Sequence, residues 1–136
     1  MTQAVQRGAS AEEIDSVEVR LLDALRAGAD DLLRADGLIL GTPENFGYMS
    51  GALKHFLDCS YNEALGQTNG MPYALYVRAG NDGSGAVSSV RRIVAGLGLR
   101  EVQEPVLMVA DFDEATLGDC EELGMTLAAG LDCGVF

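Results

Sequence analysis

The spacing of apolar residues alternates between helical and extended patterns from the start of the chain. Apolar residues recur at loosely helical intervals from Met1 to about Glu13, which predicts a first helix. Val17–Leu22 alternates apolar and polar residues before it becomes fully apolar, which predicts a strand near the edge of a sheet. Asp30–Arg34 has the acidic start of a short helical turn.

Short apolar runs and longer amphipathic segments alternate along the rest of the chain. The runs predict strands and are Gly37–Thr42, Tyr73–Val77 and Val106–Val109. The amphipathic segments predict helices and are Ser50–Cys59, Val87–Leu97 and Asp113–Leu131. Strands that alternate with helices at these lengths require crossover connections. We therefore predict one α/β domain over residues 1–136, with an open, mostly parallel sheet and helices on both faces.

Composition narrows the class of function. A chain of 136 residues with 48% hydrophobic content can bury a real core. The net charge of -12 argues against nucleic acid as a partner, and against an anionic membrane surface, because both would repel the protein. No apolar run approaches the ~20 residues needed to span a bilayer, and no signal peptide opens the chain, so we expect a cytoplasmic location.

Neither a metal centre nor a nucleophilic catalytic group stands out. The three cysteines lack a Cys-x-x-Cys spacing, and together with the single His55 they form no recognisable zinc set. His55 lies beside Lys54 and Asp58 on one predicted helix, where neighbours seldom converge with an oxyanion site. The acidic residues between Asp111 and Glu114 fit helix capping better than metal binding.

Two loops follow the carboxyl ends of predicted strands, where open parallel sheets bind ligands. In the first, Thr42–Gly51, Pro43 stiffens the exit from the strand and Gly47 permits close approach of the backbone. The second, Ala79–Gly85, is rich in glycine. Because both loops leave the same edge of the sheet, we expect them to form a crevice.

Apolar side chains in the first loop suit a flat ring. Phe46, Tyr48 and Met49 supply aromatic or soft surface, and backbone N–H groups there can meet ring carbonyls. Phe46 and Met49 equally suit a plug at the end of the sheet, and Asn81–Gly83 suits a solvated turn. The residues by themselves leave both interpretations open.

The stretch Thr42–Asp58 reads T-P-E-N-F-G-Y-M-S-G-A-L-K-H-F-L-D. It resembles the flavin-binding loop and following helix of NADPH-dependent FMN reductases, which typically read T-P-E-Y-x-G-x-x-P-G-x-L-K-x-x-L-D. Phe46–Met49 also resembles the corresponding loop of flavodoxin-like quinone reductases. The resemblance follows the element order along nearly the whole chain and implies a flavodoxin-like fold. The chain departs from the reductase pattern at Asn45, Phe46 and Ser50.

The resemblance implies noncovalently bound FMN at the strand ends, with NAD(P)H as co-substrate. Hydride would pass through the flavin to a small-molecule acceptor such as a quinone or a free flavin. The implied cofactor-binding residues are Thr42, Pro43, Glu44, Asn45, Phe46, Gly47, Tyr48 and Met49 in the first loop, and Gly80, Asn81 and Gly83 in the second. No catalytic side chain is expected, because hydride transfer to a flavin does not strictly require a side-chain acid or base.

The start of the chain departs from the flavodoxin-like pattern. Such proteins begin with a buried central strand and a Ser/Thr/Gly/Asn loop that cradles the FMN phosphate, whereas Met1 falls where the first helix is already under way. We therefore expect an N-terminally truncated fold, arising from a mis-assigned start or from a genuinely shortened protein with little FMN affinity. Without that strand, Val17–Leu22 and Gly37–Gly41 each lie one strand's width, about 5 Å, from the empty central position and stay unpaired. Alternatively, Val17–Leu22 slides over and pairs directly with Gly37–Gly41.

Three functions remain open from the sequence. The first is an NAD(P)H-dependent flavin or quinone oxidoreductase. The second is a flavodoxin-like electron carrier or binding module without nicotinamide turnover. The third is a flavin-free fragment that acts through association, since apolar edges around an absent strand would favour a homo-oligomer.

Overall fold

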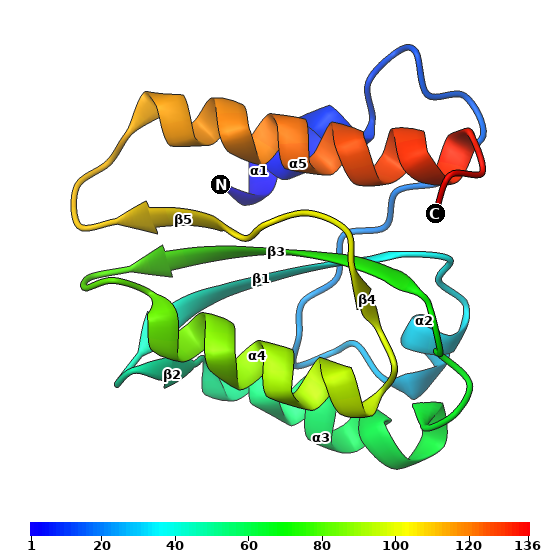
Figure 1. Ribbon diagram of the computed structural model, residues 1–136, viewed down its shortest axis with the longest axis horizontal. Coiled ribbons are helices and arrows are strands. Elements are labelled where there is room, and N and C mark those ends of the chain that lie inside the picture. The colour runs from blue at the N-terminus through cyan, green and yellow to red at the C-terminus, as the bar shows by residue number, and fades with distance from the viewer.

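The computed structural model describes residues 1–136 and has three layers, with a sheet between two groups of helices (Figure 1). The strands of the central layer are β1 (Leu38–Asn45), β2 (Tyr48–Met49), β3 (Pro72–Ala79), β4 (Arg100–Glu101) and β5 (Val106–Val109). The helices of one face are α1 (Thr2–Ala9) and α5 (Glu114–Asp132), and those of the other are α2 (Ala29–Leu33), α3 (Gly51–Ala64) and α4 (Ser84–Gly96). None of these helices is both long and apolar enough to span a membrane.

β3 is the centre of the sheet. It pairs in parallel with β1 from Leu38↔Tyr73 to Pro43↔Arg78, and its other edge pairs in parallel first with β4 and then with β5. β2 returns antiparallel along the free edge of β1, at its carboxyl end. The open, mostly parallel sheet with helices on both faces is therefore confirmed.

Two hydrophobic clusters hold the layers together. The larger lies between the sheet and α3 with α4, and includes Leu75 and Val77 of β3, which are fully buried. The smaller lies under α1 and α5. These two helices approach closely at Gly8 and Gly124, where a Cβ atom would overlap backbone of the facing helix. Small residues at the contact thus permit the tight packing of α1 on α5.

Most predicted elements are present, although several end at different residues. β5 has the predicted bounds, whereas α1 ends at Ala9 rather than near Glu13, and α3 continues to Ala64. β1 extends three residues beyond the predicted end at Thr42. β2 and β4 are not predicted, because strands of two residues carry no periodic pattern.

The predicted strand Val17–Leu22 is wrong. The segment is irregular and forms no backbone–backbone hydrogen bond, so it does not slide over to pair with β1. Alternation of apolar and polar residues favours a strand only where a neighbouring strand can supply hydrogen bonds. The edge of β1 over Leu38–Pro43 has no such neighbour on this side.

Candidate functional site

β1 continues through residues that the sequence places in a loop and ends in a two-residue hairpin with β2. Asn45 pairs with Tyr48, and the two residues between them have positive φ, 53° at Phe46 and 68° at Gly47. Positive φ at both positions defines a type I′ turn, for which Asn-Gly is the preferred pair. A bulky residue in that conformation is strained, and strain of this kind concentrates at functional sites.

The loop after β3 leads directly into α4. Gly83 caps the helix with φ of 76°, a conformation that favours glycine, and a Cβ atom there would also displace the Leu107 side chain. The Asp82 carboxylate accepts hydrogen bonds from the backbone N–H of Ser84 at 2.9 Å and from its hydroxyl at 2.8 Å. These bonds hold the pKa of Asp82 below its usual value and stabilise the turn.

The two loops lie side by side, as predicted, but they touch. Glu44 Oε1 accepts a hydrogen bond from the backbone N–H of Ala86 at 3.1 Å, which ties the hairpin to α4. Gly85 lies so close to Gly47 that a Cβ atom would overlap the Gly47 carbonyl group. The loops are therefore in contact at these glycines instead of leaving a gap there.

Backbone N–H groups in both loops have no partner within the protein. Those of Phe46 and Gly47 at the hairpin tip, and those of Gly80, Asn81 and Gly83 in the second loop, donate no hydrogen bond. The Phe46 side chain is fully exposed beside them, and that of Tyr48 is partly exposed. Free amide donors next to aromatic surface fit the carbonyl-bearing edge of a flat ring such as isoalloxazine.

Other side chains of the first loop are used by the protein itself. The buried Thr42 hydroxyl accepts a hydrogen bond from the backbone N–H of Ser50 at 2.9 Å. Met49 is buried in the larger cluster, and its N–H donates to Ser89 Oγ at 3.1 Å. Pro43 and Asn45 are exposed. These contacts leave mainly the tip of the hairpin and its backbone to face a ligand.

A phosphate group fits this edge of the sheet less well than a ring does. Helix N-termini attract phosphate, yet three of them carry side-chain partners. Ser50 accepts from the first turn of α3, Glu44 from α4, and Asp113 from two N–H groups of α5. Hydrogen bonds from Thr116 and from the α5 backbone also hold the pKa of Asp113 below its usual value. Part of each first turn is therefore already satisfied, by a hydroxyl at α3 and by carboxylates, which repel phosphate, at α4 and α5.

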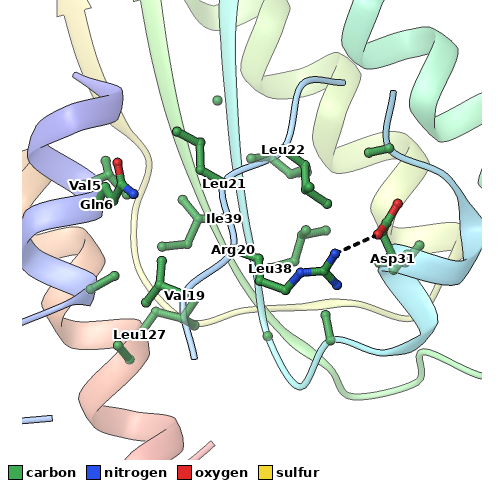
Figure 2. Close-up of a pocket in the computed structure, with 18 of the residues that line it drawn as sticks. Val5, Gln6, Val19, Arg20, Leu21, Leu22, Asp31, Leu38, Ile39 and Leu127 are labelled. Atoms are coloured by element: carbon green, nitrogen blue, oxygen red, sulfur yellow. Dashed lines mark hydrogen bonds and ion pairs between the residues drawn. The ribbon is translucent and has the colours of Figure 1, made fainter. Parts of the chain in front are cut away.

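A cavity that the sequence patterns do not reveal lies along the free edge of β1 (Figure 2). Its volume is about 930 Å³, and it is lined mainly by apolar residues of α1, Ser16–Leu22, β1 and α5. None of the sequence-predicted site residues lines it. The one sequence-based prediction that implied open space beside β1 was that of an absent first strand.

Comparison with known families and curated sequences gives two findings. The sequence model of a family described as NADPH-dependent FMN reductase matches residues 6–114. A flavodoxin from Aquifex aeolicus (strain VF5) is 33% identical over 85 residues, which are 62% of this chain and 45% of that protein. The chain thus matches less than half the length of this relative.

Solved structures share the arrangement of layers. A flavodoxin from the domain Archaea aligns with a TM-score of 0.78 at 19% identity, over 95% of this chain and 86% of that one. An NADH:FMN oxidoreductase in its apo form aligns with a TM-score of 0.61 at 20% identity, over 96% of this chain and 66% of that one. At these identities the likeness establishes the fold, which is flavodoxin-like.

Proposed function

The chain belongs to the NADPH-dependent FMN reductase family, and from this premise we propose that it is a flavin-dependent oxidoreductase. FMN binds at the carboxyl edge of the sheet, against the hairpin tip and the adjoining loop after β3. The proposed binding residues are Thr42–Met49, Gly80, Asn81 and Gly83. NAD(P)H is the proposed hydride donor, and a small molecule such as a quinone or a free flavin is the acceptor.

One observation carries the proposal. The unpaired N–H groups of Phe46 and Gly47, and those of Gly80, Asn81 and Gly83, lie on adjacent loops beside an exposed aromatic ring. Backbone amides held by a sheet and a helix are rigid, so they can orient a ring without the entropic cost of ordering a flexible side chain. The ring of Phe46 would cover one part of the flavin and exclude water from it.

Bound FMN would supply the redox chemistry, and the protein would supply position and electrostatics. Backbone donors of the two loops would hold the ring carbonyls and would favour negative charge on the ring. The side chains of Thr42 and Glu44 act indirectly, because they hold the hairpin through Ser50 and Ala86. No residue is proposed as a catalytic acid or base.

Flavin titration of the purified chain tests the proposal. FMN and riboflavin are added separately and binding is followed by quenching of flavin fluorescence. We expect saturable binding of both, with similar affinities, because three of the helix N-termini already have a side-chain acceptor and two of these acceptors are carboxylates that would repel a phosphate. Absence of saturable binding of either flavin would refute the proposal.

Steady-state kinetics test the reaction. The flavin-loaded protein is given NADPH or NADH, with a quinone or free FMN as acceptor, and oxidation of the nucleotide is measured. Turnover that depends on the acceptor supports a reductase. Flavin-loaded protein that oxidises neither nucleotide would instead favour an electron carrier, the second function that the similarity to a flavodoxin allows.

A further inference from the structure

Arg78 joins the carboxyl ends of two neighbouring strands. It lies near the end of β3, and its guanidinium group donates hydrogen bonds to three backbone carbonyl groups. Nη1 lies 2.7 Å from the Ala79 oxygen and 3.1 Å from the Met108 oxygen, and Nη2 donates to the Ala110 oxygen. Arg78 therefore fastens the end of β5 to the end of β3, beside which it lies (Figure 1).

No carboxylate competes for this guanidinium group. Arg78 forms no ion pair, whereas Arg7, Arg20, Lys54 and Arg91 each form one. Ordering the long side chain of an exposed arginine costs conformational entropy, which the three hydrogen bonds offset. The position of the side chain is thus set by the backbone of the two strand ends.

Ala110, the first residue after β5, has a left-handed backbone conformation with φ of 55°. A residue with a side chain keeps this conformation only where its surroundings enforce it. Two hydrogen bonds do so here. The N–H of Ala110 donates to the Ala79 oxygen at 2.9 Å, and its carbonyl oxygen accepts from Arg78. Without Arg78, only the first of these bonds would hold the strained turn.

The bonds to the Ala79 oxygen also fix the peptide group that joins Ala79 to Gly80. A peptide group is planar, and in the trans form its N–H points away from its C=O. No peptide bond of the chain is cis. The Ala79 C=O points toward Ala110, on the β5 side of β3. The Gly80 N–H must therefore point toward the other neighbour of β3, which is β1.

Gly80 has no restraint of its own. Glycine has the greatest backbone freedom, a Cβ atom at this position would meet nothing within 4 Å, and the Gly80 N–H donates no hydrogen bond. The hairpin at the end of β1, with the unpaired N–H groups of Phe46 and Gly47, lies on the side to which this N–H points. The bonds to the Ala79 oxygen thus direct one amide donor toward the side of the sheet that holds two others.

We propose that Arg78 is a positioning residue of the flavin site, an inference that rests on the proposed function. By holding the Ala79 carbonyl group and the turn at Ala110, Arg78 directs the Gly80 N–H toward a flavin ring bound against the hairpin tip. A donor that is oriented in advance binds a ring carbonyl without the entropic cost of ordering a glycine loop. The guanidinium group acts through the backbone.

Two methionine variants test the role of Arg78. Arg78→Met removes the three hydrogen bonds and one positive charge, whereas Arg92→Met removes the same charge from an exposed position of α4. We expect flavin affinity to fall at least about tenfold in Arg78→Met and to stay unchanged in Arg92→Met. Without flavin, the Ala110 amide should exchange its hydrogen at least about tenfold faster in Arg78→Met than in Arg92→Met. Equal affinities in the two variants would overturn the proposal.

The carbonyl stretching bands of flavin bound at saturation separate positioning from a general loss of stability. A carbonyl group that loses a hydrogen bond vibrates at higher frequency. Infrared spectra should therefore show one band at higher frequency in Arg78→Met than in Arg92→Met. A loss of affinity without this shift would overturn the proposal, because Arg78 would then only support the fold.

Arg78→Lys covers the case in which the methionine variant does not fold. Lysine keeps the charge and the apolar stem but has one nitrogen atom in place of the planar fork, so it cannot reach all three carbonyl groups. We expect it to lower flavin affinity severalfold and to speed exchange at Ala110. Parental values of both in this variant would overturn the proposal.

Amide exchange of the unmodified chain, with and without saturating FMN, tests the direction of the Gly80 N–H itself. Exchange at Gly80 should slow at least about tenfold when FMN binds. Binding of FMN without any change at Gly80 would overturn this inference and leave the proposed function intact. Absence of FMN binding would refute the proposed function, and the inference with it, so the two failures are distinguishable.

Discussion

The Glu44 carboxylate accepts a hydrogen bond from the backbone N–H of Ala86, with 3.1 Å between Oε1 and N. The bond joins the end of β1 to the first turn of α4, two segments separated by 42 positions in the sequence. A carboxylate in this position also interacts favourably with the positive end of the helix dipole. One side chain therefore couples the hairpin to the loop that precedes α4.

Replacement of Glu44 tests this coupling. Glu44→Ala should lower the free energy of unfolding by about 1 kcal/mol, because it removes a helix-capping hydrogen bond. The same change should weaken flavin binding, because the hairpin is released from α4. Glu44→Gln keeps a hydrogen-bond acceptor, so it should lose less stability and less flavin affinity than the alanine variant. Urea denaturation and flavin titration check these effects, and an alanine variant as stable as the parent would refute them.

The strained residue Phe46 at the hairpin tip should lower the stability of the protein and raise its affinity for flavin. Phe46→Asn creates the Asn-Gly pair that a type I′ turn prefers, so it should raise the free energy of unfolding by about 1 kcal/mol. It also removes the exposed ring, so flavin affinity should fall severalfold. Thermal denaturation and flavin titration measure both. Leu65→Ala, an exposed apolar position at the far end of α3, is the control and should leave flavin affinity unchanged.

Because α1 packs closely on α5, replacing glycine by alanine at two positions of α5 should have opposite effects on stability. Gly124→Ala should destabilise the protein by about 1–3 kcal/mol, because its Cβ atom would overlap the Val5 carbonyl oxygen. Gly118→Ala meets nothing within 4 Å and should stabilise the helix by about 0.5–1 kcal/mol. Thermal denaturation of both variants is the measurement. The same sign for both would contradict the packing argument.

Burial of Tyr73 predicts a loss of stability at high pH. Burial, reinforced by the negative charge of Glu101, raises the pKa of Tyr73 to about 12 in the folded protein, from 10.0. Between these values the folded state keeps a proton that the unfolded chain has lost. The stability that the neutral Tyr73 side chain contributes is therefore complete below about pH 10 and declines toward pH 12.

Urea midpoints measured across that alkaline range should fall with rising pH, and Tyr73→Phe should make the fall shallower. The pKa of Tyr76 is also raised by burial, so part of the slope should remain in the variant. An unchanged slope would show that Tyr73 does not contribute.

Local patterns determined the order of most elements and the edge of the sheet at which the two candidate loops lie. Apolar runs such as Tyr73–Val77 and amphipathic segments such as Val87–Leu97 depend on neighbours within a few residues, and the structure contains the corresponding β3 and α4. The two loops that leave the carboxyl edge were likewise predicted, because parallel strands connected by crossovers all end at one edge.

Only the tertiary structure decided which backbone groups are paired. The hairpin at Phe46, the contact of Gly47 with Gly85 and the bond from Ala86 to Glu44 join segments whose register no local pattern encodes. The same reason explains the error at Val17–Leu22. Its alternation suits a strand, but a strand exists only where another supplies hydrogen bonds, and here the neighbouring position is the cavity beside β1.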